Sequence, residues 1–486
     1  MNNPQRLGSF YWYDTETTGL VTYRDRILQF ASQRTNLEIE PIGEPFTKLV
    51  RFPPEVLPSP DALSISKLKP SQCLEQGIEE WELMRRLSNH LKHPHTRLIG
   101  YNNTGFDDFF LRYGMYRNLL PPYAHEYKNG NYRLDLLNIV RLTAALRPDG
   151  IDWPIEDDKP VFSQGAIAEA NGFNTEGLHD ASVDVNLCIK IARLIRKSQP
   201  KLWQYAIDLP VSNYIQKLLS VDVPSICLHI SAQYSNARYC IAPVLPIVLH
   251  PKLSNRVIVV DLMSNIELIL NRTTEEIQET LFRSRGQSPE NNLEHNRPGL
   301  NLVALNQSPV VAPIQTLQKS DLERLKIDLD AVHQARDNLL KVEGLQQKLQ
   351  KVYDRENEKE TEKIAEESLY DGFISDSDSQ LCKKFWQNIK LEKPWHDVNF
   401  EDQRLRDLHS RLKVRIAPEQ MSRASRTQYR EFIREQLTRP DHNLADTLKQ
   451  TEQLLKTQPP EDATDVLQDL HSYLLQQSQK FDLPLH

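Results

Sequence analysis

Residues 10–19 read FYWYDTETTG, four aromatic residues followed by a turn that carries two acids. Aromatic residues favour a strand, and glycine and threonine favour the turn that ends it. Residues 27–35 return to β-prone residues, so the two runs are predicted to pair as a hairpin. Because side chains two apart share one face of a strand, Asp14 and Glu16 point to the same side. Such a pair suits Mg²⁺, although an acidic turn is an equally good explanation.

Helical and strand-like patterns alternate after this hairpin and predict three domains. Residues 8–198 form an α/β domain, with a proline-rich loop at 51–60, a strand at 97–101 and helices at 79–90, 107–116, 134–146 and 180–197. After Gln199-Pro200, short β-branched runs broken by proline predict a β-rich domain at 200–354. The charged segment 353–363 is predicted to be a solvated helix end or a linker. An all-helical domain at 358–480 then has helices at 401–414, 427–437, 444–456 and 463–477.

Composition excludes several classes of protein. The 486 residues carry 59 basic and 66 acidic side chains, a net charge of −7, so a nucleic-acid surface would have to be local. No uncharged apolar run reaches the roughly 18 residues that cross a bilayer, and the first residues carry no export pattern. Five isolated cysteines fit a reducing compartment better than a disulfide framework. We therefore expect a cytoplasmic protein without a membrane segment.

A third acidic position follows the expected strand at 97–101. The run GYNNTGFDDF places Asp107 and Asp108 at the start of the next helix. An aspartate there stabilises a helix by bonding its free N–H groups and complementing its dipole. Since one aspartate suffices for the cap, the other is available for chemistry.

The segment HDASVD places His179 five residues before Asp184. Five residues of α-helix turn through roughly 500°, so the two side chains would point about 140° apart and could not share a site from a regular helix. We therefore expect the helix to begin after Asp180, its N-cap, with Asp184 one turn inside and His179 on the approach loop. Taken singly, a loop histidine and a helix aspartate are ordinary surface residues.

Together these motifs resemble the DnaQ-like exonucleases, which combine four acids with a histidine on a ribonuclease H-like mixed sheet flanked by helices. The resemblance implies a metal site made of Asp14, Glu16, Asp107 and Asp184. It gives His179 the role of general base and counts Glu16 as catalytic too. Two metal ions can stabilise both oxygens of a phosphodiester attacked by water, while a neutral histidine accepts the water's proton. The implied cofactor is two Mg²⁺ ions, for which Mn²⁺ can substitute.

Further motifs resemble one branch of this superfamily, the bacterial exodeoxyribonuclease I family. They are GYNN at 100–103, FDD at 106–108, ALRPDG at 145–150, EANG at 169–172 and YDGFISDSD at 370–378. The resemblance implies a nuclease domain, a Src-homology-3-like β-barrel domain and a helical C-terminal domain, the order that the patterns predict. The activity it implies is processive 3′→5′ degradation of single-stranded DNA to 5′-mononucleotides, with a role in DNA repair and recombination.

The same resemblance implies residues for DNA and for a protein partner. The implied DNA contacts are Arg112, Tyr123, Tyr127, Arg141 and Asn255. Aromatic rings suit base stacking and arginines suit phosphates, while core packing is the alternative for Tyr123. Arg147 matches the basic position that docks the acidic C-terminal tail of single-stranded-DNA-binding protein, and an interaction with its own helix end is the alternative. The chain is expected to be a monomer.

Two positions depart from the family pattern. Ser163 stands where the family has a basic residue that contacts substrate, so one phosphate contact is missing unless Lys159 replaces it. Thr17 and Thr18 resemble the proofreading branch more than the aromatic residue usual in this turn. Neither departure changes the four acids.

Two other functions are compatible with the sequence. A related enzyme could act on RNA or on mispaired primer ends, depending on whether a 2′-hydroxyl is tolerated beside Glu16. A DNA-binding protein without activity would be expected to lack one of the five site residues, and all five are present.

Overall fold

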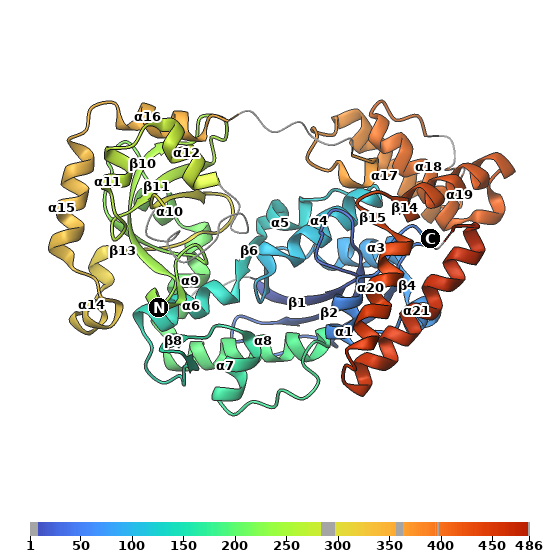
Figure 1. Ribbon diagram of the computed structural model, residues 1–486, viewed down its shortest axis with the longest axis horizontal. Helices are drawn as coiled ribbons and strands as arrows, with labels where there is room; N and C mark the ends of the chain where they lie inside the picture. Colours follow the sequence, from blue (N-terminus) through green and yellow to red (C-terminus); the bar gives the residue numbers. More distant parts are fainter. Residues whose placement is uncertain (1–7, 283–296, 356–362, 394, 396–397, 485–486) are drawn as a thin grey trace, which may run out of the picture. The chain divides into compact units, whose positions relative to one another are not determined.

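Figure 1 shows the computed structural model, which describes residues 8–282, 297–355, 363–393, 395 and 398–484. The chain folds into two compact units. The first comprises Met1–Tyr132, Glu176–Asn186 and Glu360–His486, and the second Arg133–Thr175 and Leu187–Lys359. The chain passes between the units within strand β6 (Tyr132–Asp135) and within helix α8 (Ala181–Ser198).

The first unit is built on a mixed sheet with the strand order β4-β3-β2-β1-β5-β6. Its other strands are β1 (Ser9–Thr17), β2 (Ile27–Thr35), β3 (Phe46–Arg51), β4 (Ile78–Glu79) and β5 (Thr96–Gly100). Strands β1 and β2 pair antiparallel, which confirms the predicted hairpin, and β5 lies parallel to β1. The fully buried Phe10 and Trp12 explain why β1 lies inside the sheet rather than at an edge.

Helices cover this sheet and carry part of the site. The N-terminal helices of the first unit are α1 (Pro60–Ser66), α2 (Pro70–Gln76), α3 (Glu80–His90), α4 (Asp107–Arg117) and α5 (Ala124–Tyr127). Leucine and methionine side chains of α3 and α4 pack with Tyr11 and Tyr13 of β1 in one core. Because side chains alternate along a strand, Asp14 and Glu16 leave the opposite face of the sheet. Asp14 and Glu16 therefore lie on the face opposite to the core that α3 and α4 form with Tyr11 and Tyr13.

The C-terminal part of the first unit is helical, as the sequence predicts. Its elements are α17 (Asp376–Lys390), α18 (Gln403–Ile416), α19 (Arg423–Leu437), α20 (Leu444–Lys456), α21 (Glu461–Phe481) and the short strands β14 (Thr438–Arg439) and β15 (His442–Asn443). Apolar side chains of α20 and α21 share a core with Leu63 of α1, and Figure 1 shows α1 beside these helices. The core around Phe385 likewise joins α17 and α18 to Tyr113 and Tyr116 of α4.

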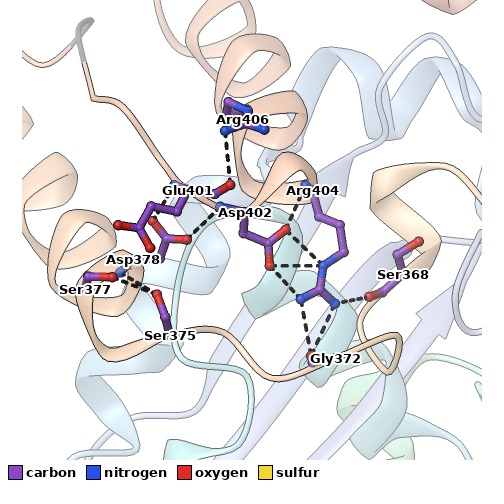
Figure 2. A network of polar contacts seen from close by, with 9 residues as sticks. All are labelled: Ser368, Gly372, Ser375, Ser377, Asp378, Glu401, Asp402, Arg404 and Arg406. Atoms are coloured by element: carbon purple, nitrogen blue, oxygen red, sulfur yellow. Dashed lines mark hydrogen bonds and ion pairs between the residues drawn. The ribbon is translucent and has the colours of Figure 1, made fainter.

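A polar network holds the segment that contains the YDGFISDSD run (Figure 2). Arg404 donates to the carbonyls of Ser368 at 2.8 Å and Gly372 at 3.2 Å, and it pairs with Asp402 at 2.6 Å. Asp378 accepts from the backbone N–H groups of Glu401 and Asp402, both at 2.9 Å. These bonds fix the loop before α17 against the start of α18.

The second unit contains an antiparallel sheet with the order β12-β11-β10-β9-β13. Its strands are β9 (Cys227–Ile230), β10 (Ile241–Leu249), β11 (Arg256–Asp261), β12 (Leu300–Ala304) and β13 (Val310–Pro313), with a separate pair β7 (Ile155–Glu156) and β8 (Lys159–Pro160). Its helices are α6 (Leu136–Leu146), α7 (Gln164–Ala170), α9 (Pro200–Asp208), α10 (Tyr214–Leu218), α11 (Glu267–Leu270), α12 (Thr274–Phe282), α14 (Lys319–Leu325), α15 (Leu329–Leu340) and α16 (Leu345–Tyr353).

The β-rich region predicted at 200–354 contains the strands expected at 240–249 and 256–262, but it opens with helices rather than strands. Pro200 is the first residue of α9, where a missing N–H costs nothing, and Trp203, Ala206 and Ile207 bury one face of that helix. The first strand of the sheet starts only at Cys227, and residues 319–353 are mostly helical. Part of the predicted linker at 353–363 lies outside the described residues. Within the described part of the chain, no helix is long and apolar enough to cross a membrane.

A buried ion pair ties α3 to α4. Glu80, the first residue of α3, is 5% exposed and accepts from Arg117 at 2.7 Å, with Arg26 at 3.7 Å. Burial alone would raise the pKa of Glu80, but the charges of Arg117 and Arg26 outweigh it and lower the pKa to about 2. The charged form of this carboxyl is therefore the one that the fold stabilises.

Replacing Glu80 with glutamine is expected to destabilise the protein by about 3–5 kcal/mol at neutral pH, because two arginines lose the anion that compensates their burial. A folded pKa near 2, below the ordinary 4.5, means that the contribution of Glu80 is complete above about pH 4.5 and is lost as the pH falls toward 2. Urea unfolding at pH 7 and thermal unfolding between pH 3 and 5 measure both effects.

The matched control is Glu82→Gln, which removes an exposed pair with Arg86 on the same helix. It should change the free energy of unfolding by less than about 0.5 kcal/mol. Equal losses in the two variants would contradict a special role for the buried pair.

Candidate active site

Asp14 and Glu16 lie near the end of β1, both partly buried and on one sheet face, as predicted. Burial raises the pKa of Asp14 well above its usual value, and the charges of Asp107, Asp184 and Glu16 raise it further. Burial likewise raises the pKa of Glu16 to about 9, with further contributions from Asp184 and Asp107. Because the charges of Asp107 and Asp184 act on both Asp14 and Glu16, the four carboxyls form one cluster.

Asp107 and Asp108 take different roles, which the sequence left open. Asp107, 4% exposed, accepts a hydrogen bond from Thr15 of β1, whereas the fully buried Asp108 accepts from Tyr13 and from Asn103. Neither aspartate is the N-cap of α4, which is Phe106 and makes no side-chain cap bond. The expectation that one of them caps the helix was wrong, because residues of β1 take their oxygens. Asp107 joins the acid cluster and Asp108 supports the fold.

Helix α8 begins as the sequence predicts. It starts at Ala181, and Asp180 accepts the backbone N–H of Ser182 at 2.9 Å as an N-cap does. His179 precedes the helix with φ of 69°, a left-handed conformation that is uncommon for residues other than glycine. Its backbone N–H donates to Asp184 at 3.3 Å, so the loop is bonded to the first turn.

The arrangement fits a divalent cation. Glu16, His179 and Asp184 each offer a ligand atom, and these atoms all lie within 4.8 Å of one another. Burial raises the pKa of Asp184 to about 6, although the nearby His179 charge and backbone N–H lower it. Carboxylates that repel one another in a partly buried place are the donor set that a hard cation neutralises, releasing the protons they hold. With Asp14 and Asp107 adjacent, the fold supplies four acids and one exposed imidazole.

Gln29 is a site residue that the sequence did not reveal. It stands opposite Glu16 in the β1–β2 ladder. Its amide nitrogen donates to Asp180 at 3.0 Å and its amide oxygen accepts from the N–H of Ala181 at 2.9 Å. One side chain of β2 thus connects the strand beside Glu16 to the start of α8. The only signal in the sequence was a polar residue within the β-prone run 27–35, and that signal does not identify a bonding partner.

Three of the implied DNA contacts lie in the first unit. Arg112 is 6% exposed and binds Glu126 with two hydrogen bonds of 2.6 and 3.0 Å, so its charge is compensated within the fold. Its guanidinium lies 5.6 Å from the ring centre of Tyr123 and also donates to Tyr370. Tyr123 is partly buried, whereas Tyr127 is 64% exposed. In this structure Arg112 holds neighbouring rings in place, and Tyr127 is the member open to a ligand.

The remaining implied residues lie in the second unit. Arg141 is partly buried and donates to Asn138 at 3.1 Å, and Asn255 is also partly buried. Arg147 donates to the carbonyls of Leu146 and Thr316 and lies 3.5 Å from Asp321. These contacts match the helix-end alternative for Arg147 and leave the partner role a prediction.

The departures from the family pattern also have places in the structure. Ser163 is exposed at the N-cap of α7, and Lys159 is exposed in β8. Thr18 donates to Asp25 at 3.2 Å and accepts from the N–H of Arg26 at 3.0 Å, so it stabilises the turn after β1.

Comparison with known proteins identifies the family. Three protein-family models match the chain. The family described as Exonuclease matches residues 11–192, the Exonuclease I SH3-like domain family matches residues 212–355, and the Exonuclease I C-terminal domain family matches residues 363–477. Exodeoxyribonuclease I of Haemophilus influenzae is 32% identical over 88% of this chain and 90% of its own length. The chain belongs to the exodeoxyribonuclease I family.

Solved structures of this family agree with the fold. Escherichia coli exonuclease I in complex with a dA16 oligonucleotide has a TM-score of 0.90 at 28% identity, covering 97% of this chain and 100% of that one. The zinc-bound form of the E. coli exonuclease I–single-stranded DNA complex has a TM-score of 0.89 at the same identity and coverage. As a member of the exodeoxyribonuclease I family the chain is an exonuclease, a hydrolase of the metal-dependent type. The predicted order of a nuclease, an SH3-like and a helical C-terminal domain is confirmed.

Replacing Gln29 with alanine is expected to lower kcat at saturating metal by about tenfold to a hundredfold, the scale for small misplacements of catalytic groups. The change removes both bonds to the start of α8, which carries Asp184. Nuclease assays over a range of Mg²⁺ concentrations should also show a higher metal requirement.

Gln33→Ala is the matched control. Gln33 lies on the same strand, and its side-chain amide donates to the backbone carbonyls of Arg34, Ile42 and Gly43. Both variants should lose about 1 kcal/mol of stability per hydrogen bond. If the two lost activity equally, Gln29 would serve the strand rather than the site.

Proposed function

We propose that this exonuclease degrades single-stranded DNA processively from the 3′ end to 5′-mononucleotides, using two Mg²⁺ ions that Mn²⁺ can replace. The observation that carries the proposal is the cluster of four mutually repelling carboxyls beside an exposed histidine near the end of β1. The E. coli relative crystallised with a single-stranded oligonucleotide supports the choice of substrate.

Asp14, Glu16, Asp107 and Asp184 would hold the metal. When bound, divalent ions lower the pKa of an attacking water and stabilise the charge on the phosphate and on the leaving 3′ oxygen. The neighbouring Gln29 and Thr15 hold the carboxyls in place through α8 and Asp107. These residues therefore supply a preorganised anionic cage that a scissile phosphate alone could not enter.

His179 is suited to remove the proton from the attacking water. It is exposed and lies before the helix, and its backbone N–H is bonded to Asp184. An imidazole can accept a proton near neutral pH. The loop therefore presents a base beside the metal-binding acids while leaving room for substrate.

The proposal predicts the products of cleavage and the substitutions that reduce activity. Single-stranded DNA labelled at either end should be shortened from the 3′ end to mononucleotides with Mg²⁺, while blunt duplex and RNA are spared. Asp184→Asn should abolish turnover but retain single-strand binding, because only the metal site changes. His179→Ala should lower kcat by about 10²–10⁴, the usual scale for a lost general base.

His471→Ala is the control, because His471 is paired with Glu452 in the helical part of the first unit. It should cleave like the unchanged protein. Comparable cleavage of duplex or RNA would overturn the substrate assignment, and near-normal turnover by Asp184→Asn would overturn the metal assignment.

We also propose that Tyr123 and Tyr127 in the first unit, and Arg141 and Asn255 in the second, each contact single-stranded DNA. Arg112 then acts chiefly by holding Tyr123 and Tyr370, since Glu126 already neutralises it. Tyr370 is 52% exposed and the centre of its ring lies 6.4 Å from that of Tyr123, so it extends the aromatic surface on which bases can stack.

We further propose a cytoplasmic monomer acting in DNA repair and recombination. The described cysteines are all free, which supports a reducing compartment.

The proposed partner is the acidic C-terminal tail of single-stranded-DNA-binding protein, docked at Arg147. Arg147→Ala should weaken the binding of a fluorescent tail peptide by about 1.5–3 kcal/mol, the range for charge-assisted bonds. Cleavage of naked single strands should stay unchanged. Fluorescence anisotropy measures the affinity.

Arg324→Ala is a matched control for the structural contribution. Arg324 pairs with the same Asp321 at 2.7 Å and also donates to carbonyls at the end of α6. If both variants lost peptide affinity equally, the effect would come from the helix end rather than from docking.

A further inference from the structure

A cavity of about 500 Å³ lies in the first unit, away from the acid cluster. Its floor includes Tyr11 of β1 and Arg34 of β2, and its rim includes Glu44, Phe46 and the end of α3 at His90. Tyr11 leaves the sheet on the face opposite to Asp14 and Glu16. The volume falls within the roughly 300–1,000 Å³ typical of small-molecule sites.

Arg34 provides a fixed cation in this cavity. Its guanidinium donates to Ser9, to Thr96 at 3.0 Å and to the carbonyl of His90 at 2.9 Å, and it lies 5.0 Å from the ring centre of Tyr11. Among the residues that the structure describes, no carboxylate lies within ion-pair distance of Arg34. All of its protein partners are neutral, so a partly buried positive charge faces the cavity without an anion. A guanidinium held in this way is suited to a phosphate.

The rest of the lining suits the other parts of a nucleotide. Phe46 and His90 form an aromatic wall, with ring centres 5.0 Å apart and planes at 83°, and the neighbouring Ile42 is 47% exposed. Lys92 places a second cation at the rim, while Glu44 offers an acceptor for N–H groups of a base. A bare phosphate would leave the apolar wall and Glu44 unused.

We propose that this cavity binds a nucleoside 5′-monophosphate, with its phosphate on Arg34 and Lys92 and its base against Phe46 and Ile42. The inference rests on the proposed function in one respect, since nucleoside 5′-monophosphates are the products that the acid cluster is proposed to release. The site is separate from the cleavage centre, because Tyr11 leaves β1 on the face opposite to Asp14 and Glu16 and none of the four acids lines the cavity.

Isothermal titration calorimetry of the full chain with 5′-dAMP tests the proposal. The titration is made in EDTA, which removes the divalent ions through which the acid cluster would bind a phosphate, so that the remaining binding belongs to the Arg34 cavity. We expect one nucleotide per chain. Arg34→Gln should weaken binding at least tenfold, and Lys92→Gln, on an exposed side chain, should weaken it several-fold without affecting the fold.

Arg86→Gln is the control, since Arg86 lies on α3 and pairs with Glu82. Unchanged affinity in Lys92→Gln and Arg34→Gln, or the absence of binding, would overturn the proposal. Inorganic phosphate or a peptide with a free carboxylate binding as tightly as 5′-dAMP would also overturn it, because the base would then contribute nothing. Both variants should still degrade single-stranded DNA at the normal rate with Mg²⁺. A chain that fails to degrade single strands would instead contradict the proposed function, whatever the calorimetry shows.

Discussion

The repulsion among four carboxyls is the constraint around which the first unit is organised. Asp14 and Glu16 come from β1, Asp107 from α4 and Asp184 from α8, and burial adds to the cost of charging them. Each segment is therefore bonded to a neighbour that resists separation. Thr15 holds Asp107, and the N–H of His179 holds Asp184. The fold partly buries four carboxyls, and their charged forms become favourable when a cation is bound.

Neighbouring acids are assigned to structure or to chemistry by the direction in which they point. Asp107 and Asp108 are adjacent, yet one faces the cluster and the other bonds to Tyr13 in the interior. Asp180 and Asp184 are one helical turn apart, and one caps α8 while the other joins the cluster. The buried ion pair between Glu80 and Arg117 stabilises this arrangement, because it holds α4, the helix that begins with Asp107, against α3.

Arginines to which the family resemblance gives a role in binding DNA or a protein partner also have contacts within the fold. Arg112 is neutralised by Glu126, and Arg147 bonds to carbonyls at the end of its own helix. A guanidinium has five donors, so one arginine can hold a protein group and still offer a donor to a ligand. Exposure separates the two cases here. Arg112 is almost fully buried, whereas the side chain of Arg147 is 29% exposed.

The sequence by itself determined the features that follow from local periodicity. A period of two placed Asp14 and Glu16 on one face, and 100° per residue placed His179 outside the helix that carries Asp184. It did not decide between Asp107 and Asp108, because that choice depends on Thr15 and Tyr13, more than ninety residues earlier. Nor did it reveal Gln29, whose partners lie 151 and 152 residues away. Nor did the β-rich pattern after residue 200 show that this region opens with helix α9, whose buried face is seen only in the packed structure. Only the tertiary structure brings distant side chains within bonding distance, and those bonds decide which polar residues serve the site.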